Sequence, residues 1–160
     1  MFARNPKHLI HSADMKVMKF VANRRNPLAE DVATSLSSLC SPTNTVVFLL
    51  ITSLVDTRIF WSFTAEVALT WSVVYGIKFL ISRERPEGNI EAGLTPSFPS
   101  AHSATAFILA SIFSQIIPAS GFLLYSLAVS AALFRIYLQT HYLSDVAVGS
   151  VIGFLLSNVI

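Results

Sequence analysis

Three short clusters of polar and charged residues interrupt a chain that is otherwise apolar. They are Lys78…Arg85-Pro86, Pro99-Ser100-Ala101-His102 and Arg135…His141…Asp145. Lysine and arginine bind oxyanions, and arginine makes bidentate contacts to phosphate oxygens. Histidine serves as nucleophile, base or acid near neutral pH. These residue types together suit the transfer of a phosphoryl group.

The spacing within the first two clusters predicts where their side chains point. Lys78 and Arg85 lie about two helical turns apart and project from nearly the same face, and Pro86 ends that helix. Ser100 follows a proline and is a good N-cap, which puts His102 in the first turn of the next helix. A helix N-terminus binds anions through its free N–H groups and its positive dipole end.

The third cluster predicts an oriented histidine. His141 and Asp145 stand at i and i+4, so on a helix the carboxylate reaches the imidazole and fixes its tautomer. The other ring nitrogen is then a nucleophile or base. With His102 as the second histidine, one attacks phosphorus and the other protonates the departing oxygen. The cations supply the charge stabilisation that phosphate ester hydrolysis requires.

Each residue alone has an ordinary structural explanation. Lys78 alone could be a helix-end lysine whose ammonium reaches the membrane interface, and Arg83 and Arg85 alone could be membrane anchors. The His141–Asp145 pair alone could be an ordinary hydrogen bond. Their convergence from three separate places on one membrane face favours a site instead. No acidic pair or His/Glu ligand set lies nearby, so we expect neither metal nor cofactor.

The elements that position these residues belong to a membrane protein. Of the 160 residues, 53% are hydrophobic and only 12% are charged, with a mean hydropathy of +0.62, whereas soluble domains carry about 25% charged residues. Cys40 is the only cysteine, which excludes an internal disulfide and a cysteine-based zinc site. No cleavable signal peptide and no nucleic-acid partner are expected.

Five apolar stretches follow the N-terminal region. They lie at about 43–55, 60–81, 103–117, 120–138 and 144–160. A span needs about 20 residues, so the second and fourth stretches suffice, whereas the first must borrow from its flanks. The expected fold is all-α: an integral membrane helical bundle of about five transmembrane helices, forming a phosphatase domain over residues 42–160.

Residues 1–41 form a basic N-terminal segment with two expected amphipathic helices. The second helix carries an apolar stripe at helical spacing, formed by Leu28, Val32, Leu36 and Leu39. We expect both helices to lie in the membrane interface. The alternative is a short cap packed on the bundle.

Five spans place the N-terminal segment and the loops after the second and fourth spans on one side. Ten of the eleven lysines and arginines then share that face, with Arg58 alone opposite. The ten are Arg4, Lys7, Lys16, Lys19, Arg24, Arg25, Lys78, Arg83, Arg85 and Arg135. One face of the protein therefore meets anions.

Over about residues 60–160 the three clusters resemble the motifs of the type 2 phosphatidic acid phosphatase superfamily: K-x6-RP, PSGH and SR-x5-H-x3-D. The first matches in full. Ala101 replaces the glycine of the second, and Phe134 replaces the serine of the third. Alanine in place of glycine matters only where a positive φ is needed, and the lost serine removes no catalytic group. An active enzyme is expected.

The resemblance implies a role for each matched residue. His141 would form a phosphohistidine with Asp145 orienting it, and His102 would protonate the leaving oxygen and later activate water. The phosphoryl oxygens would be held by Lys78, Arg85, Ser100 and Arg135, with help from the Ala101 backbone N–H.

The resemblance also implies a metal-independent membrane lipid phosphatase whose partner is a phosphorylated lipid. Lipid A 1-phosphate is the leading substrate, because the basic N-terminal segment could contact a second negative group on its headgroup. Undecaprenyl diphosphate and phosphatidylglycerophosphate are alternatives, as is phosphotransfer through the same phosphohistidine. A non-catalytic anionic-lipid-binding protein would not need both histidines and Asp145.

Membrane orientation depends on two opposing arguments. The positive-inside rule places the basic face in the cytoplasm, whereas the family has its site on the periplasmic side of the bacterial inner membrane. Four of the ten cations belong to or adjoin the expected site, where function explains them. We therefore expect a multi-pass inner-membrane protein whose site faces the periplasm.

Overall fold

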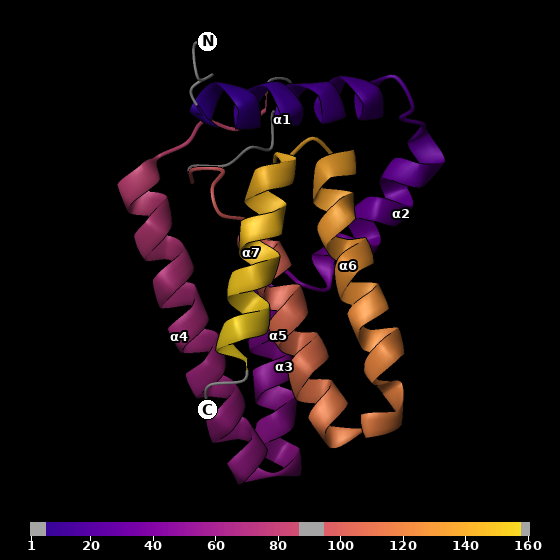
Figure 1. Ribbon diagram of the computed structural model, residues 1–160. Helices are drawn as coiled ribbons and strands as arrows, with labels where there is room; N and C mark the ends of the chain where they lie inside the picture. The colour runs from indigo at the N-terminus through magenta and orange to yellow at the C-terminus, as the bar shows by residue number, and fades with distance from the viewer. Residues whose placement is uncertain (1–5, 87–94, 158–160) are drawn as a thin grey trace.

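A computed structural model describes residues 6–86 and 95–157, and all its regular elements there are helices (Figure 1). They are α1 (Pro6–Ala22), α2 (Pro27–Ser38), α3 (Pro42–Val55), α4 (Thr57–Ile81), α5 (Ala101–Ile116), the short η1 (Pro118–Ser120), α6 (Gly121–Tyr137) and α7 (Leu143–Leu156). The five apolar stretches correspond to α3–α7, apart from residues 158–160, which lie outside the described residues. The predicted all-α membrane bundle is confirmed.

The bundle is packed through small residues. α5 contacts α4, α6 and α7, and Figure 1 shows α1 lying across one end of the bundle. The buried alanines of α5 and α6 are Ala101, Ala104, Ala106, Ala110, Ala128, Ala131 and Ala132. Small residues let helix backbones approach closely, as is typical of helix packing in membranes.

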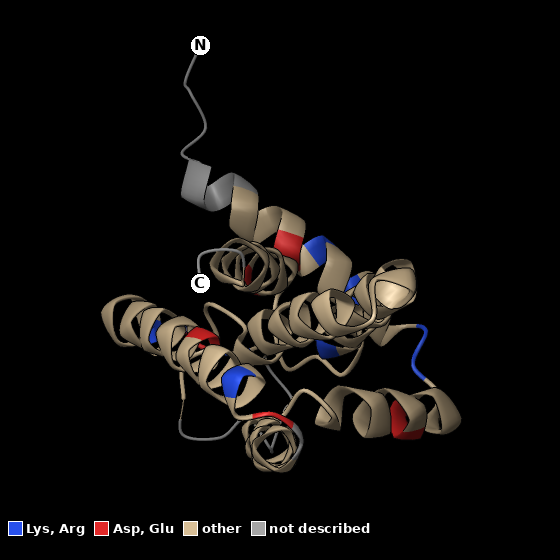
Figure 2. Ribbon diagram, turned by 90° about the horizontal axis from the view of Figure 1, so that it is seen from below, with Lys and Arg blue, Asp and Glu red and all other residues tan. Residues whose placement is uncertain are grey.

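Large apolar side chains point outward instead. Leu54 is 87% exposed, Phe79 91% and Phe122 91%. Figure 2 shows only a few charged positions along the bundle helices. A surface of this kind is costly in water and favourable against lipid chains, so the outer face of the bundle suits a bilayer.

Length and composition identify the helices that can cross a membrane. In the described part of the chain, α4 qualifies alone, as does the 20-residue segment Pro118–Tyr137 that contains α6. α2 and α3 qualify together as a pair bent by 44°. α5 and α7 are apolar but shorter. The short 43–55 stretch thus has α2 as a continuation, which the sequence pattern did not indicate.

The predicted apolar stripe of α2 is exposed along its length, at Leu28, Val32, Leu36 and Leu39. Leu28 is 76% exposed, whereas Ala33 and Ser37 are buried against the bundle. The N-cap is Asn26, whose side chain accepts from the Ala29 N–H at 2.9 Å. α2 therefore buries its small residues against the bundle, whereas Leu28 is largely exposed and Leu36 lines a groove beside α6.

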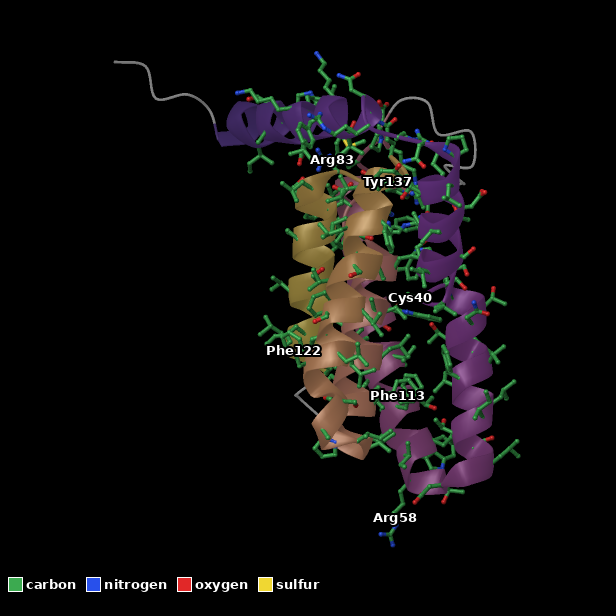
Figure 3. The ribbon with its side chains drawn as sticks, turned by 90° about the vertical axis from the view of Figure 1, so that its right-hand side faces the viewer. Cys40, Arg58, Arg83, Phe113, Phe122 and Tyr137 are labelled. Atoms are coloured by element: carbon green, nitrogen blue, oxygen red, sulfur yellow. The ribbon has the colours of Figure 1, made fainter. Side chains whose placement is uncertain are left out.

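α1 closes the end of the bundle where the predicted site lies. Its buried Met18 packs in a cluster with Ile136 of α6 and Val146 of α7. Figure 3 shows Arg83 near this end and Arg58 at the opposite end, as the span count predicts. Arg4, also assigned to the basic face, lies outside the described residues.

α7 approaches α5 closely at two glycines, Gly149 and Gly153, which the sequence motifs do not include. A Cβ on Gly149 would collide with the backbone oxygen of Ser100, and one on Gly153 with that of Ala104. The glycines are four residues apart and form one strip on α7. Any side chain there forces the two backbones apart.

We predict that Gly153→Ala destabilises the protein by about 1–3 kcal/mol through overpacking. Gly76→Ala in α4 is the matched control, because a Cβ there meets nothing within 4 Å. It should be neutral or stabilising by up to about 1 kcal/mol. Thermal unfolding in detergent, followed by tryptophan fluorescence, compares the two variants. Equal melting temperatures would contradict the close packing of α5 on α7.

Candidate active site

The three predicted clusters meet at the α1 end of the bundle. Lys78 is in the last turn of α4, Ser100 caps α5, and Arg135 is in the last turn of α6. His141 lies between α6 and α7, and Asp145 in the first turn of α7. The charges of Arg135, Arg85 and Lys78 act on both His102 and His141. The charged and histidine side chains that the sequence predicts for the site therefore lie at one end of the bundle, close enough for their charges to interact.

Lys78 and Arg85 are held by the backbone that leads into α5. The Lys78 ammonium is buried and donates to the carbonyl oxygens of Pro96 and Ser97. The Arg85 guanidinium donates to the Thr95 oxygen at 3.0 Å and, through Nη1, to the Thr140 oxygen at 3.0 Å. Arg85 thus joins the loop before α5 to the loop before α7.

Ser100 is the N-cap that the sequence predicts. Its Oγ accepts from the Ser103 N–H at 3.3 Å, and its own N–H donates to the Asp145 carbonyl oxygen at 3.0 Å. Ala101 is already helical, whereas the described non-glycine residues with positive φ are Ser82 and Gln139. The alanine in place of the motif glycine is therefore unstrained.

The two ring nitrogens of His141 face different partners. Nδ1 lies 3.6 Å from Asp145 Oδ2, and Nε2 lies 3.4 Å from Arg85 Nη1. The Nδ1 distance exceeds that of a normal hydrogen bond, as apo catalytic contacts often do. His141 is 2% exposed, and burial lowers its pKa to about 4, against an opposing effect of Asp145. The imidazole is therefore neutral at physiological pH.

Arg135 connects the site to α2. Its Nη1 donates to Ser37 Oγ at 3.5 Å, and its backbone oxygen accepts from the His141 N–H at 3.2 Å. The preceding Phe134, which replaces the motif serine, lines an apolar groove of about 130 Å³. The replacement thus places an aromatic ring beside the cation cluster.

This groove lies between α6 and the α2–α3 pair, with α5 as its floor; Figure 3 shows Cys40 and Phe113 in this region. Its α5 residues share one helix face with His102, at i+4, i+7, i+8 and i+11. The lining residues are Leu36, Leu39, Cys40, Ala106, Leu109, Ala110, Phe113, Leu124, Leu127, Ala128, Ser130, Ala131 and Phe134. An apolar groove therefore runs along the α5 face that carries His102 at its N-terminal end.

Two residues near the site, Arg83 and Asp14, were given no role in it from the sequence. Arg83, which the sequence suggests as an anchor, contacts Asp145 at 2.7 Å and Asp14 of α1 at 2.7 Å. Asp14 is only 2% exposed. The available signal was a carboxylate at helical spacing from the apolar residues Val17, Met18 and Val21 of α1, which pack together on the bundle.

Solved structures resemble this fold closely. A PAP2-type phosphatidylglycerolphosphate phosphatase from Bacillus subtilis aligns with a TM-score of 0.82 and 22% identity, covering 92% of this chain and 82% of that one. LpxE from Aquifex aeolicus aligns with a TM-score of 0.78 and 24% identity, covering 89% and 91%. No curated protein sequence matches the chain.

The match to a protein family is independent of these structures and covers the same elements as the site. Residues 60–160, from α4 to the end of the chain, match the PAP2 superfamily. This range holds all three clusters, and it extends over more than half of the sequence. The chain therefore belongs to the PAP2 superfamily.

Proposed function

We propose that the protein is a membrane lipid phosphatase that works through a phosphohistidine on His141. The observation that carries the proposal is the two-sided environment of this ring. Nδ1 faces the buried Asp145 carboxylate, and Nε2 faces Arg85 within the cation cluster. A phosphoryl group bound by those cations lies in front of the unprotonated nitrogen.

The bonds in this reaction balance without a further co-reactant. Nε2 of His141 forms a bond to phosphorus while the bond to the lipid oxygen breaks, and His102 gives that oxygen a proton. His102 then takes a proton from water, which attacks the phosphohistidine and releases inorganic phosphate. Lys78, Arg85, Ser100, Arg135 and the backbone N–H of Ala101 stabilise the charge on the phosphoryl oxygens.

The apolar groove favours a lipid over a water-soluble ester. It starts at Phe134, next to Arg135, and follows the α5 face that also carries His102. A leaving oxygen near His102 would thus continue into hydrocarbon that lies in the groove. The groove is closed on one side by α2, whose Ser37 contacts Arg135.

Lipid A 1-phosphate is the leading substrate, as the basic α1 segment suggests. Undecaprenyl diphosphate, phosphatidylglycerophosphate and transfer to an acceptor other than water are the alternatives. We place the site on the periplasmic face of the inner membrane. We further propose that the reaction needs no metal, since Lys78, Arg85 and Arg135 would supply the positive charge that the phosphoryl oxygens require.

We predict phosphate release by the detergent-purified protein from one lipid of a panel far above the others. The panel holds lipid A, undecaprenyl diphosphate, phosphatidylglycerophosphate and phosphatidic acid. His141→Ala should reduce release at least ~10³-fold, because no other side chain replaces the nucleophile. The measurement is inorganic phosphate released per minute at saturating lipid.

Two controls accompany the panel. Arg58→Gln, at the opposite end of the bundle, should keep full activity. EDTA should leave the rate unchanged, and loss with EDTA contradicts the metal-free mechanism. If the folded wild-type protein releases no phosphate from any lipid of the panel, hydrolysis of these lipids is contradicted. If labelled phosphate appears on an added alcohol instead, the reaction is phosphotransfer.

The two histidines should respond differently to the leaving group. We predict that His102→Gln costs ~10²–10⁴-fold in kcat on a lipid phosphate, the usual contribution of a general acid. The phenolate that leaves an aryl phosphate with an acidic phenol needs no proton. The rate at which such a substrate phosphorylates His141 should therefore be nearly normal in His102→Gln. Rapid-quench measurement of protein-bound phosphate tests this. An equal loss of the phosphorylation rate with both substrates would show that His102 is not the general acid.

The pKa of His141 makes a separate prediction. A ring with a pKa of about 4 is almost entirely neutral at pH 6, whereas an unperturbed histidine, with a pKa of about 6.5, is mostly protonated there. Protonation blocks Nε2, so the nucleophile is lost only as the pH falls through about 4. The ring resonances of His141, assigned with His141→Ala and followed between pH 3.5 and 8, report the midpoint. A midpoint near 6.5 would contradict the buried neutral ring.

A further inference from the structure

The guanidinium of Arg83 lies where three distant segments of the chain meet. Nη1 donates to Asp145 Oδ1 and to Ser144 Oγ, each at 2.7 Å, and Nη2 donates to Asp14 Oδ2 at 2.7 Å. The guanidinium also stacks on the ring of Tyr142, 4.1 Å from its centroid. One side chain thus joins α1, the segment after α4 and the start of α7.

Asp14 holds the other end of this network. Its Oδ1 accepts from the Ser144 N–H at 3.0 Å, and its Oδ2 accepts from the Ser144 hydroxyl at 2.6 Å. A carboxylate at the first turn of a helix also interacts favourably with the helix dipole. α1 therefore supplies a cap to α7 from more than a hundred residues away.

The network fixes the orientation of the Asp145 carboxylate. Arg83 holds Oδ1, and the Tyr142 N–H holds Oδ2 at 2.9 Å, on the oxygen that faces His141. With both oxygens held, the carboxylate has one rotational position. Without Arg83, Oδ1 loses a charged donor in a fully buried place, and the carboxylate is free to turn.

Charge balance gives the same assignment. Asp14 and Asp145 are buried carboxylates on either side of one guanidinium. A buried charge without its partner is strongly unfavourable. Arg83 therefore keeps Asp145 ionised and in place, and Asp14 keeps Arg83 in place.

We propose that Arg83 and Asp14 are positioning residues that act on His141 through Asp145, which makes α1 a working part of the site. This inference rests on the proposed function, since it assumes that Asp145 orients the nucleophile. Arg83 occupies a variable position of the first motif and Asp14 lies outside all three, and neither contacts the phosphoryl group in the proposed reaction.

The tautomer of His141 tests the proposal without requiring turnover. The chain has only four histidines, so two-bond 1H–15N spectra in micelles, assigned with His141→Ala, resolve each ring. We expect the proton of wild-type His141 to reside on Nδ1. In Arg83→Gln and Asp14→Asn it should redistribute toward Nε2. Arg58→Gln and Asp31→Asn, exposed changes of the same type, should leave the tautomer as in the wild type.

Kinetics provide the second readout. Arg83→Gln and Asp14→Asn should lower kcat by about 10–100-fold, as loss of an outer hydrogen-bond partner commonly does, with KM within threefold. Arg83→Lys should recover part of the rate, because one ammonium can reach Asp145 but cannot also hold Asp14 and Ser144. Asp14→Asn keeps an oxygen for the Ser144 N–H, so this variant retains the cap and should fold.

The outcomes separate this inference from the proposed function. A folded Asp14→Asn or Arg83→Gln protein with the wild-type tautomer and wild-type kcat overturns the positioning role. A lower melting temperature with an unchanged tautomer also overturns it, since the role is then structural only. A wild-type protein with the expected tautomers but no activity on any lipid contradicts the phosphatase assignment and leaves the positioning role standing.

Discussion

The site end of this protein depends on one constraint: charged groups inside an apolar bundle must be paired. Asp145 is fully buried, and its oxygens are satisfied by Arg83 and the Tyr142 N–H, with His141 alongside. These partners come from the segment after α4 and from the loop that joins α6 to α7. The desolvation cost of the carboxylate is offset only when all of these elements are in place. The packing of these elements therefore also assembles the polar cluster.

The second constraint is the close approach of α5 and α7. Gly149 and Gly153 let the α7 backbone lie directly on α5, and this contact allows the Ser100 N–H to bond the Asp145 carbonyl oxygen. The N-terminus of α5, which carries the PSAH sequence, is thereby held beside the His141–Asp145 pair. Packing in the apolar part of the bundle thus sets the geometry of the polar end.

The molecule keeps its cation cluster separate from its apolar groove. Cations and histidines gather beneath α1, while the groove between α6 and the α2–α3 pair is apolar. The PAP2 fold supplies this division, and α1 and α2 complete it: Asp14 reaches Arg83, and Ser37 reaches Arg135. The basic N-terminal segment is therefore more than a membrane anchor, because two of its helices contact the site.

The sequence by itself determined the features that depend on the spacing of residues close together in the chain. The Ser100 cap and the helical stretches all follow from periodicities of a few residues, and the cluster motifs placed the site at one end of the bundle. Tertiary structure decided the rest. Arg83 and Asp14 are 69 residues apart, and no local pattern tells an arginine that anchors to a membrane from one that pairs with a buried carboxylate. The groove that Leu36, Leu39 and Phe134 line likewise arises only where separate helices pack. A helix periodicity shows which residues share a face but not which neighbour that face will meet.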